Sequence, residues 1–404
     1  MHILLIHQAF AAINEPGGTR HHELSRFLAA KGHRVTVITS QASYLTGGST
    51  GVAMEEIEPG VRIIRLPVKA NLHKSFVHRL LNFFDFMFVS YKAGKTVSGV
   101  DLVWGTSPPL FQGITAWRLA RRNKVKFLFE VRDLWPDFAI DVGVLKNPLL
   151  IKLSYWLEKF LYRKADTVIV NSPGYIEPVK SKGAKRVELV PNGSDPAMFT
   201  PKRSAIDMRH SYGIPEDVFV ILYAGAHGIS NDLETVLRSA HKLGSDGKVL
   251  FVLVGDGKEK RNLMSSAASM GLNNVRFIDS VAKESMGDVL GMADCCLAIL
   301  KNIPMYRLTY PNKVFDYMAA GKPVILCIGG VIADLVEREG AGVMVPPGDP
   351  TALADAITKL QYNKDELSKM GESGKSAILR EFNRESIANK LLRIVESLVG
   401  TKNG

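Results

Sequence analysis

The sequence predicts an α/β protein made of two doubly wound domains. Two sets of short, β-branched apolar runs alternate with longer amphipathic segments, as expected for parallel sheets covered by helices on both faces. The second set begins near residue 218, after a stretch (191–217) that is rich in Pro, Gly and Ser, has no periodicity and is interpreted as an unstructured linker. A chain of 404 residues is long enough for two well-buried cores.

The first set of runs predicts the strands of the N-terminal domain. Each run is short and apolar, and the segments between them have helical spacing; one of these, 21–32, ends on Gly32. The predicted strands are residues 2–7, 34–39, 61–66, 101–105, 126–130, 166–170 and 186–190.

The second set predicts the C-terminal domain, with strands at 218–225, 248–257, 275–279, 294–300, 322–328 and 342–346. We assign residues 1–195 and 205–375 to the two domains, and we expect the C-terminal helix, about 382–404, to pack back on the first. Ligands of such sheets bind beyond the carboxyl ends of the strands. We therefore expect the two domains to face each other across a ligand-binding cleft.

The composition restricts the class of protein to which this chain can belong. Charged residues make up 23% and hydrophobic residues 46%, which is typical of a globular protein. Cys295, Cys296 and Cys327 lie in apolar runs without metal-ligand spacing, which indicates buried thiols in a reducing compartment. The first ten residues lack the basic region and cleavage site of a signal peptide, and no apolar run is long enough to span a bilayer. We expect a cytoplasmic protein.

The net charge of +11 is concentrated in the first half of the chain. Residues 118–126 contain five basic residues and no acid, and 181–186 contain three and no acid. Such runs are often solvated helix faces, but a basic surface can also bind anionic lipid or an acidic substrate. Nucleic acid is the weakest of these partners, since the sequence has no zinc spacing, no aromatic RNA-binding pattern and no recognition-helix signature.

The first candidate site lies between the first predicted strand and its helix. Gly17 and Gly18 directly precede the helix, where glycine lets backbone N–H groups approach a phosphate and the helix end attracts anions. The spacing is not that of the dinucleotide fingerprint. A simple turn is the alternative, but long loops in compact domains are often functional.

The second candidate site follows the strand at 126–130. Glu130, Arg132, Asp133 and Asp137 cluster there, around the Trp-Pro pair 135–136. The alternative is a structural ion pair of Arg132 with a neighbouring acid. Charges at the end of a buried strand are costly unless they are used or paired. We predict Glu130, Arg132 and Asp133 as catalytic residues.

A third candidate site lies in the second domain. Gly225 and Gly228 flank His227 ahead of a helix, a pattern that presents backbone N–H groups at the positive helix end. The charges in 258–261 are interpreted as surface charges.

The stretch YPNKVFDYMAAGKPV (310–324) predicts a short helix that opens at Pro311 and ends at Gly321. Asn312 and Lys313 stand at its beginning, where Lys313 can bind a diphosphate. Asp316, one turn later, can accept hydrogen bonds from two ribose hydroxyls. An acid near a helix N-terminus also interacts favourably with the helix dipole, which is the structural alternative.

Together these segments resemble the retaining glycosyltransferases of family 4, which have the GT-B fold of two Rossmann-like domains. The resemblance covers nearly the whole chain and is strongest in 16–39, 130–137, 311–324 and 340–357. Among family members, RDLWPD and PNKVFDYMAAGKPV are most similar to enzymes of O-antigen and capsule clusters, including N-acetyl-fucosamine transferases.

The resemblance implies that the second domain binds a nucleotide diphosphate sugar, which we expect to be UDP-linked. It also implies that the first domain binds an acceptor. Asp316 matches the acid that binds the ribose, and Gly17 and Gly18 match the loop near the donor phosphates. Arg132 and Asp133 fall where many relatives have a His-containing pair near the donor sugar.

The sequence departs from the family pattern in two places. The first acid of the family motif falls at Leu308, which cannot hydrogen-bond a sugar. The basic residues that many relatives use on the diphosphate are also missing from the loop 225–232. We expect Lys313 to substitute for them, together with His227 and the helix N-termini, and we also predict Gly228 and Asn312 as donor-binding residues.

The implied reaction is transfer of an N-acetylated hexosamine or deoxyhexosamine to a lipid-linked or saccharide acceptor, with retention. No Asp-x-Asp motif is present, so we predict no metal, and we expect no cofactor besides the nucleotide-sugar donor. The basic first domain and the aromatic segment 76–91 would suit the anionic inner face of the cytoplasmic membrane, although a buried helix explains that segment equally well.

Two other functions fit the same fold. A nucleotide-sugar 2-epimerase would use the donor but no acceptor. A non-catalytic nucleotide-sugar-binding subunit would explain the missing acid at Leu308.

Overall fold

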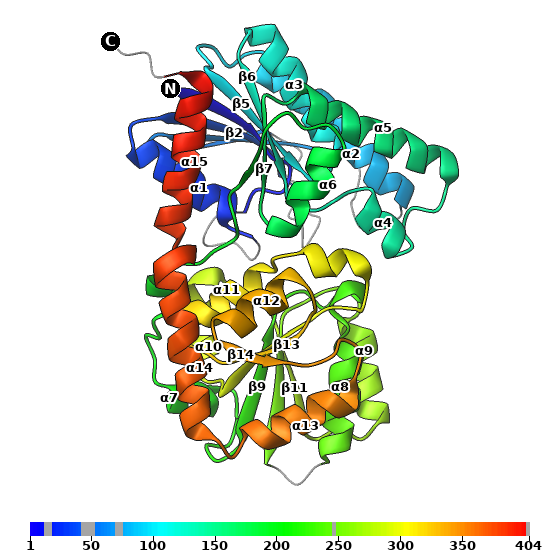
Figure 1. The fold of residues 1–404 in the computed structure, drawn as a ribbon, viewed down its shortest axis with the longest axis vertical. Helices are drawn as coiled ribbons and strands as arrows, with labels where there is room; N and C mark the ends of the chain where they lie inside the picture. Colours follow the sequence, from blue (N-terminus) through cyan, green and yellow to red (C-terminus); the bar gives the residue numbers. More distant parts are fainter. Residues whose placement is uncertain (12–17, 42–52, 69–75, 245–247, 401–404) are drawn as a thin grey trace. The chain divides into compact units, whose positions relative to one another are not determined.

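The computed structural model of the chain describes residues 1–11, 18–41, 53–68, 76–244 and 248–400. The chain forms two compact units, of which the first comprises residues 1–191 and 387–404 and the second residues 192–386 (Figure 1). The boundary between them lies at Pro191 and Asn192.

The first unit contains a sheet with the strand order β3-β4-β2-β1-β5-β6-β7-β8 among its described residues. The strands are β1 (His2–Ile6), β2 (Arg34–Ser40), β3 (Met54–Glu58), β4 (Val61–Leu66), β5 (Leu102–Ser107), β6 (Lys126–Val131), β7 (Thr167–Val170) and β8 (Val187–Leu189). The pairs are parallel, except that β3 runs antiparallel to β4 at the sheet edge.

Helices cover this sheet, as the alternation of runs predicts. They are α1 (Arg20–Ala30), α2 (Phe76–Gly94), α3 (Phe111–Asn123), α4 (Asp137–Asp141), α5 (Pro148–Lys164) and α6 (Ile176–Ser181), preceded by the short turn η1 (Pro173–Tyr175). The last helix, α15 (Arg384–Val399), adds Ile387, Leu391 and Val395 to a buried cluster that includes Ile3 and Leu24. The core of the first unit is therefore completed by the end of the chain.

The second unit contains a parallel sheet with the strand order β11-β10-β9-β12-β13-β14. Its strands are β9 (Phe219–Ala224), β10 (Val249–Val254), β11 (Val275–Ile278), β12 (Cys295–Ile299), β13 (Val324–Cys327) and β14 (Gly342–Met344). Strands β9, β10, β12 and β13 are almost completely buried, which explains their continuous apolar sequences.

The helices of the second unit are mostly short. They are α7 (Ala205–Ser211), α8 (Leu233–Leu243), α9 (Lys260–Ser269), α10 (Met286–Gly291), α11 (Asn312–Ala319), α12 (Val331–Arg338), α13 (Pro350–Leu360) and α14 (Lys364–Ala377). Short helical turns occur at η2 (Pro196–Phe199), η3 (Ile229–Asn231), η4 (Lys283–Ser285), η5 (Pro304–Leu308) and η6 (Ile378–Phe382). Two buried apolar clusters lie in this unit.

Three local features differ from the sequence-based expectation. Strand β3 carries three glutamates and was not expected, because its alternation is weak; its pairing with β4 also makes the first sheet mixed rather than wholly parallel. Residues 191–217 were expected to be an unstructured linker, yet they contain η2 and α7. Arg209 of α7 is buried and donates hydrogen bonds to the carbonyls of Met292 and Glu216, which fixes this stretch to the second unit.

Candidate functional site

The carboxyl end of the second sheet brings together the loops that follow β9, β10, β11 and β12, because these strands are neighbours in the sheet. The loops after β9 and β10 contact each other directly. Gly225 N–H donates to the Val254 carbonyl (3.0 Å), and His227 N–H donates to the Asp256 carbonyl (2.8 Å). These two N–H groups therefore do not face a phosphate, contrary to the expectation for this loop.

Glycine is required where the two loops meet. A Cβ atom on Gly255 (φ +145°) would lie 1.9 Å from the Gly225 carbonyl oxygen, and one on Gly257 (φ +157°) 2.4 Å from the His227 carbonyl oxygen. The basic side chain of Lys260 was expected to be surface charge, but it donates to the carbonyls of Gly255 (2.9 Å) and Ile278 (3.2 Å). The loops thus form one interlocked edge.

His227 is completely buried in this edge, and neither ring nitrogen has a hydrogen-bond partner among the described residues. Burial, with nearby Lys260 and Lys313, lowers the pKa of His227 to about 4. The imidazole is therefore neutral at pH 7 and does not supply the positive charge that we expected of it on a diphosphate. Gly228, which follows, directly precedes η3.

Lys313 extends from the first turn of α11 toward the loop after β9. Its Nζ atom lies 3.9 Å from the centroid of the Tyr223 ring and 3.4 Å from Oδ1 of Asn231. A Cβ atom on Gly225 would come within 2.9 Å of Nζ, so the ammonium group lies against that glycine. Lys313 forms no ion pair with a carboxylate of the described residues, and burial lowers its pKa to about 7.

Asn312 begins α11 immediately after Pro311. The Oδ1 atom of Asn312 is buried and has no hydrogen-bond partner in the part of the chain that the structure describes. Buried polar atoms are normally satisfied, so this oxygen is a candidate contact for a bound ligand. Leu308 ends the turn η5, and no acidic residue lies within that turn.

Asp316 has partners that the sequence did not reveal. Ser194 Oγ donates to one carboxylate oxygen (2.7 Å), and Lys283 forms an ion pair with the other. Lys283 Nζ also lies 4.8 Å from the ring centroid of Phe199. A carboxylate has about four acceptor positions, so these two contacts leave room for ribose hydroxyls, but they also give Asp316 a structural role.

The two roles of Asp316 are separable by experiment. If the ribose hydroxyls donate to Asp316, the wild-type protein should bind UDP about tenfold more tightly than 2′,3′-dideoxy-UDP, and Asp316→Ala should abolish that preference. Isothermal titration calorimetry measures both affinities. The variant Lys283→Met removes the ion pair but should keep the preference. A preference that survives in Asp316→Ala would leave Asp316 with only its structural contacts.

In the first unit, the carboxyl ends of β1, β5 and β6 carry the charged cluster. Glu130 is completely buried, and its two oxygens accept from Arg20 Nε (3.0 Å) and His21 Nε2 (2.8 Å) of α1. Burial alone would raise the pKa of Glu130, but His21 and Arg20 hold it well below its ordinary value. Both oxygens are occupied, so the geometry gives Glu130 the role of positioning α1 rather than contacting substrate.

His7 joins this network at the end of β1. Its ring lies 4.0 Å from that of His21, and its Nδ1 atom is 2.8 Å from Oγ1 of Thr106 on β5. Burial lowers the pKa of His7 well below its ordinary value. The sequence offered no signal for His7, while Arg20 and His21 lie beside the glycine motif but were interpreted only as part of a helix.

Arg132 and Asp133 follow β6 and are only partly buried. Arg132 Nε donates to the Ser107 carbonyl (3.1 Å). Burial raises the pKa of Asp133 to about 6, although Arg132 opposes this shift. A carboxyl that titrates near neutral pH at a strand end is suited to proton transfer.

Among the remaining predicted residues, Asp137 of α4 binds Tyr155 of α5 and Lys182 (2.7 Å), which directly follows α6. Gly17 lies outside the described residues. Gly18 is exposed just before α1, and a Cβ atom there would meet nothing within 4 Å. No group of three metal-ligating side chains occurs within the described ranges.

Comparisons with known proteins agree with the fold of the two units. The Glycosyl transferase 4-like domain matches residues 17–193, and Glycosyl transferases group 1 matches residues 218–363. The putative colanic acid biosynthesis glycosyl transferase WcaI of Escherichia coli (strain K12) is 26% identical over 351 residues, which cover 83% of this chain and 86% of WcaI.

Solved structures with the same fold include the following two. Sucrose-phosphate synthase from Thermosynechococcus elongatus superimposes with a TM-score of 0.80 at 22% identity and covers 98% of each chain. Anabaena HepE, in complex with UDP-glucose, superimposes with a TM-score of 0.72 at 15% identity over 98% of this chain and 100% of HepE. The 4-like domain falls on the first unit and the group 1 domain on the second. This chain is therefore a glycosyltransferase of the GT-B fold.

Proposed function

We propose that this glycosyltransferase transfers an N-acetylated hexosamine or deoxyhexosamine, with retention and without a metal, from a UDP-sugar to a lipid-linked saccharide of a surface polysaccharide. The second unit binds the nucleotide. Asp133 and Arg132 of the first unit contact the reacting sugar or its acceptor, and the enzyme works at the inner face of the cytoplasmic membrane.

The observation that carries this proposal is Lys313. A lysine that is largely removed from water and has no carboxylate partner among the described residues is costly to maintain. It lies at the carboxyl end of a parallel sheet, where ligands of such folds bind. A diphosphate would supply the missing negative charge. When the bond between the sugar and the diphosphate breaks, the growing charge on the leaving group would be stabilised by this ammonium group.

The names of similar proteins support the sugar chemistry and the pathway class. WcaI is named for colanic acid biosynthesis, and a second relative, 25% identical over 289 residues, is named a lipopolysaccharide core glycosyltransferase. HepE was solved with UDP-glucose. The choice of an N-acetylated sugar follows from the likeness of 130–137 and 311–324 to N-acetyl-fucosamine transferases.

A thermal-shift screen tests the donor. UDP and UDP-N-acetyl sugars should raise the melting temperature of the full-length protein more than GDP, TDP or CMP compounds at equal concentration, because only a ligand of the native state stabilises it. An equal or larger shift with another nucleotide would refute the UDP assignment.

Product analysis then tests the reaction. With donor and a membrane lipid extract, we expect UDP release and a new glycolipid whose anomeric configuration matches that of the donor, unaffected by EDTA. With donor alone, release should be at least tenfold slower. UDP release or sugar epimerisation without an acceptor would favour the epimerase, and binding without turnover in any extract would favour the binding subunit.

A further inference from the structure

Helix α5 of the first unit exposes an unusual stripe of side chains. Its buried face contains Leu157, Leu161 and Tyr162, as expected for a helix that packs on a sheet. Its other face exposes large apolar side chains in its first half and cations along its length. This set, the α5 face, consists of Leu149 (65% exposed), Leu153 (51%), Trp156 (63%), Lys152, Lys159, Arg163 and Lys164.

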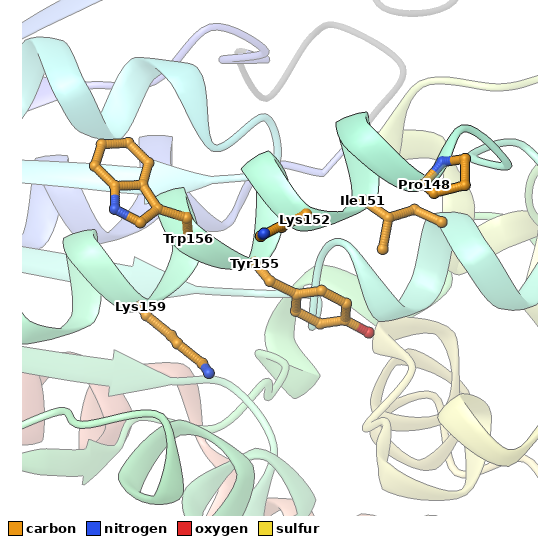
Figure 2. Close-up of a pocket in the computed structure, with 6 residues that line it drawn as sticks. All are labelled: Pro148, Ile151, Lys152, Tyr155, Trp156 and Lys159. Carbon is orange, nitrogen blue, oxygen red and sulfur yellow. The ribbon is translucent and has the colours of Figure 1, made fainter.

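Two shallow grooves run along this helix. The larger, of about 530 Å³, is lined by six residues from successive turns of α5: Pro148, Ile151, Lys152, Tyr155, Trp156 and Lys159 (Figure 2). The second groove continues along the C-terminal half of the helix between Trp156 and Lys164. Both grooves therefore combine apolar surface with lysine or arginine side chains.

The α5 face contains no acidic residue. The single acid of the helix, Glu158, is completely buried and binds Lys182 (2.8 Å) and Tyr162 (3.0 Å). None of the four cations of the face forms an ion pair within the described part of the chain. The neighbouring helix α3 adds positive charge, because Trp117 contacts Phe160 (4.8 Å between centroids) and Arg121 lies over the Trp117 ring.

Helix α2, which the sequence offered as a membrane contact, is less suitable. It buries Asn82, Phe86 and Ser90, so the buried-helix interpretation holds for one face. It exposes Phe84 and Phe88 on the other, and the lysine of its last turn, Lys92, follows this apolar stretch instead of interleaving with it. No helix in the described ranges is long and apolar enough to cross a bilayer.

We propose that the α5 face docks on an anionic phospholipid bilayer, with the helix lying in the membrane plane. Trp156, Leu153 and Leu149 would enter the boundary between headgroups and acyl chains. The lysine stems would lie along the apolar surface while their ammonium groups contact lipid phosphates. A membrane is favoured over a protein partner because the surface is uniformly cationic at its polar positions and carries tryptophan at its centre.

This inference deepens the proposed function, since a lipid-linked acceptor would then lie within reach of the bound enzyme. It does not depend on that function experimentally, because vesicle binding needs neither donor nor acceptor. Failure of the transfer reaction and failure of membrane docking are therefore separate results.

Sedimentation of the full-length protein with vesicles tests the proposal. We expect binding to vesicles of phosphatidylethanolamine and phosphatidylglycerol, weakened by 0.5 M salt, and little binding to pure phosphatidylcholine. Lys152→Glu/Lys159→Glu should reduce binding roughly thirtyfold or more, and Leu153→Ser/Trp156→Ser about tenfold or more. Unchanged melting temperatures would show that these exposed variants fold.

Matched variants in the second unit serve as controls. Lys242→Glu/Lys359→Glu changes the net charge equally, and Ile206→Ser/Tyr362→Ser removes comparable exposed apolar surface; both should bind like the wild type. Equal loss in the charge control would mean that net charge alone drives binding and would overturn the assignment to α5. So would absence of vesicle binding, or sedimentation equilibrium showing that the α5 variants abolish self-association of the protein instead.

Discussion

Replacing Lys313 with methionine will weaken UDP binding by about 100-fold, or roughly 3 kcal/mol. The substitution removes the one positive charge that lies against Gly225 without a carboxylate partner among the described residues, while methionine keeps most of the volume. Isothermal titration calorimetry at pH 7 measures the loss. The free energy of unfolding should not fall, because burial of an ammonium group destabilises the native state.

The exposed Lys258 in the neighbouring loop provides the matched control, and Lys258→Met should bind UDP within a factor of about three of the wild type. If Lys313→Met binds as tightly as Lys258→Met does, the diphosphate is not held by Lys313. The position of Lys313 would then no longer support the proposed donor site.

The lowered pKa of Lys313 also predicts how the affinity for UDP depends on pH. With a pKa of about 7 in the free protein, Lys313 is largely neutral at pH 8.5, and a bound diphosphate would raise that pKa. Affinity for UDP should therefore fall above pH 7, by up to tenfold per pH unit, with uptake of close to one proton on binding at pH 8.5. Calorimetry in buffers of different ionisation enthalpy measures that uptake, which should vanish in Lys313→Met.

Replacing Asp133 with asparagine will lower turnover at least 100-fold and change the KM for the donor little. At pH 8 it will also raise the free energy of unfolding, by up to about 3 kcal/mol. Turnover should fall if the Asp133 carboxylate accepts the proton of a substrate hydroxyl. The free energy of unfolding should rise because burial raises the pKa of Asp133 to about 6, so that ionising this carboxyl at pH 8 destabilises the native state.

The direction in which stability changes with pH follows from the direction in which burial shifts the pKa of Asp133. Asp133 has a higher pKa in the folded than in the unfolded chain, so the folded state binds more protons and its stability falls as pH rises from about 4 to 6. Chemical denaturation at pH 5 and pH 8 should show that asparagine is stabilising mainly at the higher pH. In the wild type, kcat/KM should rise with pH to a plateau above about 6, and Asp133→Asn should lack this limb.

Asp141, an exposed acid at the end of α4, is the control, and Asp141→Asn should leave both turnover and stability nearly unchanged. A variant Asp133→Asn that is more stable yet fully active would show that Asp133 has no part in catalysis. A loss of turnover without the pH-dependent stability change would contradict the environment that the structure gives this carboxyl.

The fold was predictable because its signals are local and repeated. Buried parallel strands such as β10 and β12 have no polar face, so their sequences are continuous apolar runs. Helix α11 is marked at both ends, by Pro311 and by Gly321 with φ +67°. Strand β3 was missed because an edge strand rich in glutamate lacks this hydrophobic signal.

The candidate site was predictable only in part, because ion pairs join residues that are far apart in the sequence. Glu130 meets Arg20 and His21 across about a hundred positions, and Asp316 meets Ser194 and Lys283. A motif indicates that an acid stands at a strand or helix end, but not whether its oxygens are already occupied. The occupied carboxylate of Glu130 and that of Asp133, which has no ion-pair partner among the described residues, cannot be distinguished from the stretch EVRD alone.

The path of the chain has a consequence for domain dissection. Helix α15 starts in one unit and finishes in the other, contributing Ile387, Leu391 and Val395 to the interior of the first. A fragment that stops at residue 191 would leave that interior open to water and should aggregate or remain molten. Supplying a peptide of residues 384–400 in trans should restore a folded N-terminal half, which makes this helix a natural point for split-protein complementation.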